Sequence, residues 1–267
     1  MIRQETATDW VLITHPDHAR LAGRFADAWG NERFARPEPY QDIRYAVYHH
    51  DDGWLARDAA PSLTPAGLPE AFTRTLVGAY SAFEEIDLPA YLAVRARATA
   101  EVAEVNPYAG ILVSMHTYNL LSEQADLDSI RPEHRDAHAR FLDEQKSWQQ
   151  ETAARLGAAP EALLRGFEFL QCCDNLSLIV CSGYEQPRTL RHTHPDADGV
   201  RHTIRCAPAG ADTYTLDPWP LAPDELELEI PCRQVPKAEA TTTGAFRAAF
   251  AAAPVATRRV TLRRAAA

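Results

Sequence analysis

The stretch Tyr45-Ala46-Val47-Tyr48-His49-His50-Asp51-Asp52-Gly53-Trp54 places four ionisable side chains directly after an apolar lead-in. Imidazole and carboxylate groups bind metal ions and transfer protons, and Gly53 permits a tight turn at the end of the run. No other ten residues of the chain are so dense in such groups. His50 and Asp51 are therefore the starting point, and the question is which other parts of the chain supply partners for them.

Composition limits the classes of function. The 267 residues are 46% hydrophobic, enough for a substantial core in one large domain or in a main domain with a smaller appendage. The sequence has neither an apolar run long enough for a bilayer nor a signal-peptide layout, so we expect a cytoplasmic protein without membrane association. A net charge of -10 disfavours nucleic acid as a partner. Five cysteines without a C-x-x-C spacing predict reduced packing residues.

Apolar periodicity predicts a mainly helical part that reaches to about residue 183. The expected helices are 16–29, 70–85, 90–105, 108–121, 132–156 and one that opens at Pro160. Proline is favoured in a first helical turn, and Pro16, Pro132 and Pro160 all stand at such starts. The apolar run 9–14 suits a strand or the entry to a core.

Three polar residues fall on apolar faces of these helices. His18 is in phase with Phe25 and Trp29, and His116 stands among Leu and Val residues. Asp174 occupies a position where the helical stripe demands an apolar residue. Burying an unpaired carboxylate is costly, so a buried Asp together with buried His indicates a cation. Mixed imidazole and carboxylate ligands suit a divalent Mn, Fe, Co, Ni or Zn ion.

The character of the sequence changes after residue 183. Period-two alternation runs through 200–206, 212–216, 225–232 and 259–263, and the Ala-rich segment 241–254 suits a short helix. We expect a small antiparallel sheet with one dry face, with 9–14 as a candidate extra strand. The predicted fold class is α+β, mainly α. A helical domain over 1–183 holds the metal site, and a β-rich region over 184–267 packs on it.

The order His18, His50-Asp51, His116 and Asp174 resembles that of the HD-domain superfamily of metal-dependent phosphohydrolases, over residues 15–182. His50-Asp51-Asp52-Gly53 matches the His-Asp-x-Gly form common there, although Trp54 follows where many members have Lys. The helical part is accordingly expected to be an HD-like bundle. With its Leu170–Leu178 and Asp217–Pro220 segments, the chain as a whole looks like a bacterial family of unknown function numbered 3891.

The resemblance implies roles for individual residues. The metal ligands would be His18, His50, Asp51 and Asp174, with His116 as a further ligand or a proton-transfer group. Asp51 and His116 are thus the expected catalytic residues. The expected supporting residues are His49 and Asp52, which would orient ligands, and Trp54, Tyr118 and Asn119, which would line a pocket. Only His116 is well placed between Asp51 and Asp174, which favours one metal ion over two.

Each of these residues alone also fits an ordinary structural role, such as a hydrogen-bonded core His or an Asp satisfied by Arg165 or Ser177. Their coincidence favours a metal site. The leading hypothesis is a metal-dependent hydrolase of a small phosphorylated substrate, such as a phosphomonoester or nucleotide. One alternative is a di-iron HD-type oxygenase. Another is a non-catalytic metal-binding or interaction module.

Overall fold

The computed structural model describes residues 1–73, 88–125 and 127–266. The helices are α1 (His15–Ala28), α2 (Tyr40–His49), α3 (Leu55–Ala59), α4 (Leu88–Val105), α5 (Pro107–Asn119), α6 (Arg135–Leu156), α7 (Pro160–Ser182) and α8 (Thr243–Ala252). The strands are β1 (Ile2–Glu5), β2 (Asp9–Ile13), β3 (Phe72–Thr73), β4 (Arg188–Pro195), β5 (Arg201–Gly210), β6 (Thr213–Asp217), β7 (Glu225–Pro236) and β8 (Val255–Arg264). A short 3-10 turn, η1 (Asp52–Trp54), links α2 to α3.

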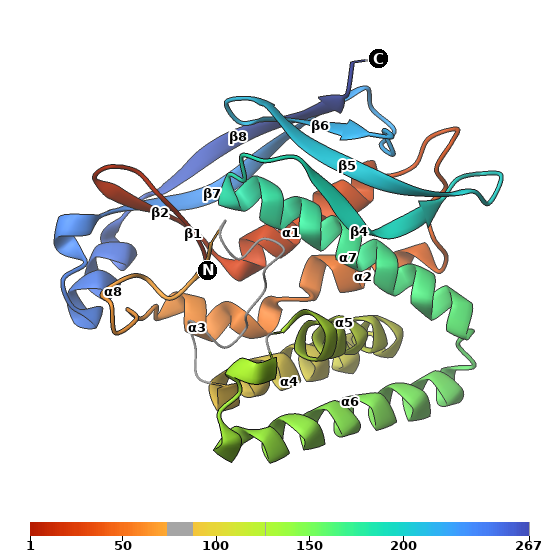
Figure 1. The fold of residues 1–267 in the computed structure, drawn as a ribbon, viewed down its shortest axis with the longest axis horizontal. Helices are drawn as coiled ribbons and strands as arrows, with labels where there is room; N and C mark the ends of the chain where they lie inside the picture. Colours follow the sequence, from red (N-terminus) through yellow and green to blue (C-terminus); the bar gives the residue numbers. More distant parts are fainter. Residues whose placement is uncertain (74–87, 126, 267) are drawn as a thin grey trace.

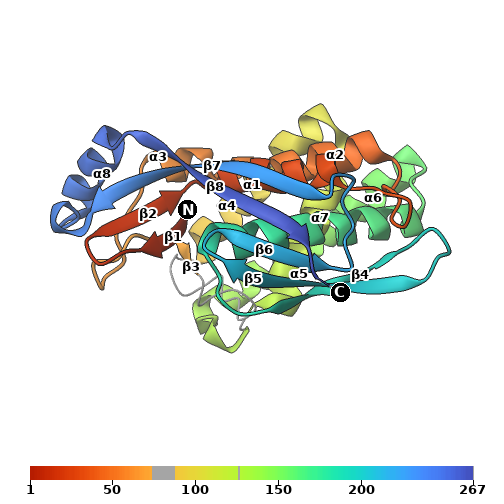
Figure 2. The same ribbon diagram turned by 90° about the horizontal axis from the view of Figure 1, so that it is seen from above.

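The described strands form one mixed sheet in the order β3-β1-β2-β7-β8-β6-β5-β4. Most neighbours are antiparallel, but β6 and β8 run parallel, as do β1 and β3. The sheet covers α1 and α7, while α4, α5 and α6 lie farther from it (Figure 1). Figure 2 shows the strands crossing above these helices. Runs of helices and runs of strands are therefore interleaved along the chain, but they form separate layers in space.

The expectation of an HD-like helical bundle followed by a small antiparallel β region is wrong. The sheet is mixed rather than antiparallel, and it also contains strands from the N-terminal part of the chain. The candidate strand at 9–14 is confirmed as β2, which pairs with β7 with Asp9 opposite Pro236. The physical reason that this strand belongs inside the sheet is its alternation: Val11 and Ile13 join the main core, while Trp10 and Leu12 join a second cluster with α8. Such a strand must be covered on both faces. The predicted domain boundary at 183/184 stays a prediction, although α7 does end there at a left-handed Gly183.

Most individual elements were predicted correctly. The helices expected at 16–29, 90–105, 108–121 and 132–156 and the one opening at Pro160 are confirmed as α1, α4, α5, α6 and α7, within a few residues at their ends. The helix expected at 70–85 lies mostly outside the described residues, and its described start contains β3 instead. Within the described ranges, no helix combines the length and apolar character needed to cross a bilayer.

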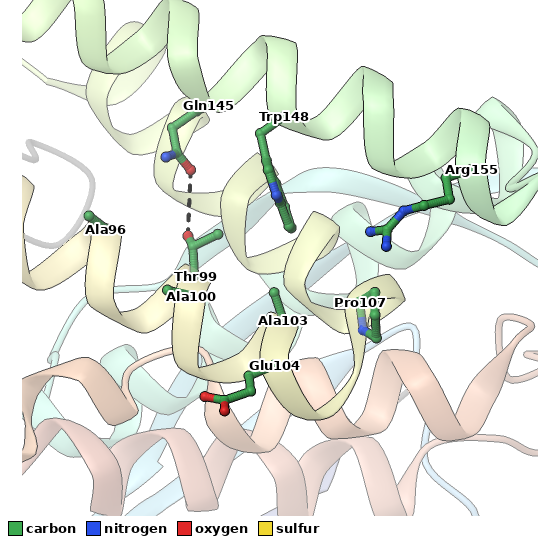
Figure 3. A pocket seen from close by; sticks show the side chains of 9 residues that line it. All are labelled: Ala96, Thr99, Ala100, Ala103, Glu104, Pro107, Gln145, Trp148 and Arg155. Atoms are coloured by element: carbon green, nitrogen blue, oxygen red, sulfur yellow. Dashed lines mark hydrogen bonds between the residues drawn. The ribbon is translucent and has the colours of Figure 1, made fainter.

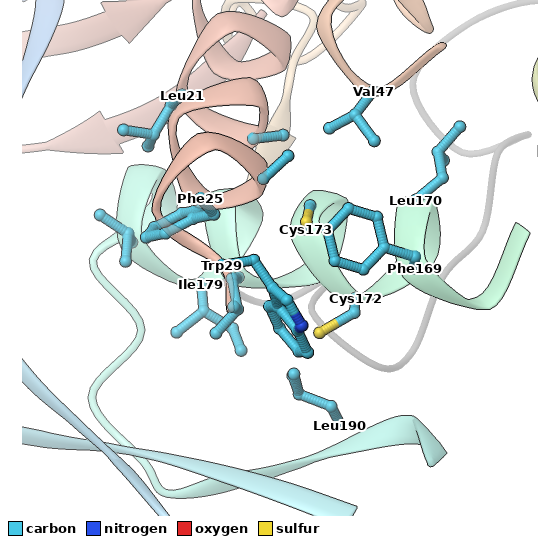
Figure 4. Close-up of a cluster of buried hydrophobic side chains, with 14 of the residues drawn as sticks. Leu21, Phe25, Trp29, Val47, Phe169, Leu170, Cys172, Cys173, Ile179 and Leu190 are labelled. Carbon is cyan, nitrogen blue, oxygen red and sulfur yellow. The ribbon is translucent and has the colours of Figure 1, made fainter. Parts of the chain in front are cut away.

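The main core lies between α1, α7 and the inner face of the sheet. Phe25 of α1 and Trp29, which directly follows α1, lie in one buried cluster with Phe169, Cys172 and neighbouring residues of α7 (Figure 4). The Trp29 and Phe169 rings meet edge to face with centroids 5.1 Å apart. All five cysteines are buried and free, which confirms their predicted role as packing residues. This packing fixes α1 against α7 and so fixes the polar residues that the two helices share.

Gly53 is where η1 meets α4, and we predict that it tolerates no side chain. A Cβ there would lie 2.7 Å from both the Val94 carbonyl oxygen and the Ala98 nitrogen, which are backbone atoms that cannot turn aside. Gly53→Ala should lower the free energy of unfolding by about 1–3 kcal/mol through overpacking. Urea unfolding monitored by circular dichroism measures this.

The matched control is Gly244→Ala in α8, where the nearest atom to an added Cβ lies 4.0 Å away. Its stability should be unchanged or raised by up to about 1 kcal/mol, because Ala is the better helix former. Equal stabilities for the two variants would contradict the close contact between η1 and α4.

Candidate metal centre

His18 is positioned by the start of α1. Thr14 caps the helix, its Oγ accepting the Asp17 backbone N–H at 3.1 Å, and Pro16 stands in the first turn. This start turns His18 inward, where it is 1% exposed. Its Nδ1 lies 2.7 Å from Ser177 Oγ and its Nε2 lies 3.0 Å from Asp51 Oδ2. The predicted inward orientation of His18 is confirmed.

His50 and Asp51 stand at the end of α2, where the chain turns into η1. Both are buried, at 0% and 3% exposure. The last carbonyls of a helix lack intrahelical partners, and His50 Nδ1 donates to one of them, the Val47 oxygen, at 2.8 Å. The helix end therefore supplies the group that orients the His50 ring.

The remaining two residues come from α5 and α7. His116 is buried, and its Nδ1 lies 3.0 Å from Gln171 Oε1. The Gln171 amide nitrogen in turn donates to Asn119 Oδ1 at 2.7 Å, which fixes Gln171 with its oxygen towards His116. Asp174 is one turn beyond Gln171 on α7 and is 5% exposed. The helical spacing of Gln171, Asp174 and Ser177 places all three on one face.

These five residues converge. Asp174 Oδ1 lies 3.3 Å from His50 Nε2 and 3.7 Å from His18 Nε2, and Asp51 Oδ2 lies 3.9 Å from His50 Nε2. Ligand atoms bound at about 2.0–2.2 Å to one ion are about 3.0–3.5 Å apart when adjacent. Two overlapping groups can each hold a metal ion, one formed by His18, His50 and Asp174 and the other by His50, Asp51 and His116.

The hydrogen bonds determine which nitrogen of each ring is free. Ser177 Oγ donates its only proton to the Asp174 carbonyl oxygen at 2.8 Å, so it must accept from His18 Nδ1–H. His50 Nδ1–H donates to a carbonyl and His116 Nδ1–H to an amide oxygen. In their neutral forms all three rings therefore carry a lone pair on Nε2. Imidazole ligands of metals are commonly oriented in this way.

The electrostatics show two buried anions. Burial raises the pKa of Asp51, but the Arg95 guanidinium, with His50 and His18, holds it well below its usual range. Burial also raises the pKa of Asp174, and the neighbouring His50, His116 and His18 outweigh that and lower it. Both carboxylates are thus ionised at neutral pH, and they need positive charge beside them.

The histidines differ in charge. Burial lowers the pKa of His50, but Asp51 and Asp174 outweigh this and raise it to about 9. Burial lowers the pKa of His116 to about 4, so that ring is neutral. His50 Nε2 lies close to Asp174 yet makes no hydrogen bond, because the contact is misaligned. The contact therefore acts chiefly through charge attraction between the ring and the carboxylate.

Arg95 completes the centre and was missed from the sequence. It is 4% exposed, and its Nη1 donates to Asp51 Oδ1 at 2.6 Å. Its Nε donates to Tyr91 Oη at 3.1 Å, and its guanidinium lies 5.6 Å from the Trp54 ring centroid. The signal was available, because Arg95 is in phase with Tyr91 and Val102 on the apolar face of the helix predicted at 90–105.

The predicted supporting residues lie in different places. His49 and Asp52 pair with each other at 2.6 Å and are partly exposed. Trp54 is buried beside Arg95 and stacks on His15, with ring centroids 4.2 Å apart. Asn119 accepts a hydrogen bond from Gln171, which in turn contacts His116. Tyr118, the residue before Asn119, is half-buried.

A separate cleft of about 420 Å³ lies between α4 and α6 (Figure 3). Small residues of α4 form one side, and Gln145, Trp148 and Arg155 of α6 form the other. Gln145 Oε1 accepts a hydrogen bond from Ser114 Oγ at 2.7 Å. None of the five converging residues lines this cleft, nor does Trp54, Tyr118 or Asn119.

Comparison with known families matches residues 1–237 to a family described as a protein of unknown function, DUF3891. The chain belongs to this family. The match runs through β7, so the matched part of this chain contains all five converging residues and the two N-terminal strands. No curated protein and no solved structure matches the chain. The resemblance to family 3891 is therefore confirmed, whereas these comparisons give no support to a link with HD-domain proteins.

The pKa of His50 predicts how the metal-free protein responds to pH. The folded value of about 9 lies above the unfolded value of 6.5, so the folded state holds this proton more tightly. The resulting stability is fully present below pH 6.5 and is lost as the pH rises to 9, on the order of 3 kcal/mol. Urea unfolding of chelator-treated wild type and His50→Gln across this range checks it. The stability gap between the two should shrink with pH, and parallel curves would contradict the assignment.

Proposed function

We propose that this protein is a metal-dependent hydrolase of a small phosphorylated substrate, such as a phosphomonoester or a nucleotide. The observation that carries the proposal is the orientation of three buried imidazoles, each with Nδ1–H held by an acceptor and Nε2 directed towards two ionised carboxylates. Without a metal ion His50 is protonated, and its Nε2 lies 3.3 Å from Asp174 and 3.9 Å from Asp51 yet makes a hydrogen bond to neither. A buried polar atom without a partner is costly, and a metal ion bound at Nε2 would satisfy it.

The ligand set supports a borderline divalent ion. His18, His50, Asp51 and Asp174 would hold it, and Mn, Fe, Co, Ni and Zn all accept mixed nitrogen and oxygen ligands. Such an ion lowers the pKa of a bound water and polarises a phosphoryl oxygen. The order of these ligands along the chain is the one that resembles HD-domain phosphohydrolases, and the proposed substrate class comes from that resemblance.

His116 is suited to a second role beside the ion. Its ring is neutral, and its Nδ1–H is committed to Gln171, so Nε2 is a proton acceptor rather than a donor at neutral pH. It can therefore complete the ligand set or accept a proton from water. In either role it acts beside His50 and Asp51, with which it forms one of the two overlapping candidate groups.

Net charge favours an anionic substrate. Two carboxylates and Arg95 together carry a charge of about −1, and a divalent ion brings the centre to about +1 when the histidines are neutral. A phosphate group would be attracted to such a centre. The centre with its ion would thus be positive, whereas the chain as a whole carries a net charge of -10.

Metal content and phosphatase activity test the proposal. Purified wild type should contain about one equivalent of transition metal and should hydrolyse p-nitrophenyl phosphate or a nucleoside monophosphate when Mn²⁺, Co²⁺ or Ni²⁺ is supplied. The double variant His50→Ala/Asp51→Ala should lose bound metal and at least about 100-fold of the activity, because two ligands are removed. Elemental analysis and a phosphate-release assay measure both.

A matched control removes a His–Asp pair outside the centre. His202 and Asp196 make a contact of 2.7 Å at the β4–β5 hairpin, and His202→Ala/Asp196→Ala should keep both metal and activity. Metal-free wild type that stays inactive with every added ion would overturn the proposal. Two ions with oxygen consumption would favour the di-iron oxygenase instead. An unchanged melting temperature after metal stripping and in Asp174→Asn would favour a non-catalytic module.

A further inference from the structure

The two carboxylate oxygens of Asp51 face different partners. Oδ1 accepts from Arg95 Nη1 at 2.6 Å, whereas Oδ2 faces His18 and His50 at 3.0 and 3.9 Å. The guanidinium is held in place by Tyr91 Oη and by the rings of Tyr91 and Trp54, whose centroids lie 5.1 and 5.6 Å away. It is buried and oriented, unlike a surface arginine that can swing away.

A pair of metal ions about 3.5–4 Å apart is a common arrangement in phosphate-hydrolysing sites. Such a pair needs bridging or additional ligands, and a carboxylate bridges by binding one ion with each oxygen. Asp51 cannot do this while Arg95 holds Oδ1. His50 cannot either, because its Nδ1–H is committed to the Val47 carbonyl and only Nε2 is open.

We propose that Arg95 stands in for a second metal ion: it is a positioning residue that restricts the centre to one ion and supplies a fixed positive charge beside it. This inference rests on the proposed metal centre and deepens it. His116 belongs to the same candidate group as Asp51, because its ring nitrogen lies within 4.8 Å of an Asp51 carboxylate oxygen. Removing Arg95 would therefore leave Asp51 Oδ1 without its positive partner, in a group that also contains His116.

Mn²⁺ binding to full-length variants tests this role without any assay of activity. Wild type and Arg95→Lys should each bind one Mn²⁺ per chain, because both keep a positive charge at Asp51 Oδ1. Arg95→Glu replaces that charge with a third carboxylate and should bind two. Equilibrium dialysis with elemental analysis gives the stoichiometry. Electron paramagnetic resonance should show an isolated ion in the first two proteins and a spin-coupled pair in the third.

Two further variants provide a second test and a control. Arg95→Gln removes the charge with little change in size, and it should bind a second Mn²⁺ more weakly than Arg95→Glu, so it carries the test if the latter does not fold. Arg44→Glu makes the same change at another Arg–Asp pair, since Arg44 Nε lies 2.5 Å from Asp27 Oδ1. Its partly exposed site should give no coupled pair, which controls for adventitious binding by adjacent carboxylates.

The outcomes separate this inference from the proposed function. One Mn²⁺ and an uncoupled spectrum in folded Arg95→Glu and Arg95→Gln would overturn the role of Arg95, as would two ions in wild type. A wild type that binds one Mn²⁺ but hydrolyses no phosphate ester, with a coupled pair in Arg95→Glu, would support the role of Arg95 while overturning the hydrolase. A wild type that binds no Mn²⁺ would overturn both, and it would be recognised before any variant is made.

Discussion

The constraint on which the centre depends is the burial of two ionised carboxylates, Asp51 and Asp174, inside a helical layer. An uncompensated carboxylate in such a place would cost several kcal/mol or would take up a proton. The fold meets this cost with groups from separate elements: His18 from α1, His50 from the end of α2, Arg95 from α4 and His116 from α5. The neutralisation of the two anions therefore depends on the packing of these helices, because a shift of any one of them would leave a buried charge without its partner.

Helix α7 organises the centre more than any other element. It supplies Asp174 and also the two side chains, Gln171 and Ser177, that hold His116 and His18 by their Nδ1 atoms. These three residues are spaced by three along the helix, so one polar face carries both the carboxylate and the groups that orient the two histidines. The other side of α7 packs through Phe169 and Cys172 on α1 and the sheet. The sheet thus acts on the centre by fixing α7, although it contributes no ligand of its own.

Sequence reasoning succeeded where the information is local. His18, His116 and Asp174 were found because a helical phase shows which side chains face inward, and the structure brings them together with His50 and Asp51. Arg95 fits the same phase argument but was missed, because a long basic side chain is usually assumed to reach solvent. The sheet was misjudged for a different reason. The strand at 9–14 was a candidate from its apolar run, but its pairing with β7 joins segments more than 200 residues apart, which local alternation does not show. Strand β4 is rich in Arg, Thr and His, so it gives no alternating signal of its own.

The stretch around His50 and Asp51 connects these local and distant contributions. Because α2 ends at His49, the Val47 carbonyl is free to accept His50 Nδ1–H, and the helix end itself selects the tautomer that leaves Nε2 open. Gly53 then lets η1 approach the α4 backbone so closely that no Cβ fits between them. That approach brings Arg95 within reach of Asp51 Oδ1, while Trp54, next in sequence, lies beside the guanidinium. The position after Gly53 therefore carries an aromatic ring beside a buried arginine, and the positive charge next to Asp51 comes from α4.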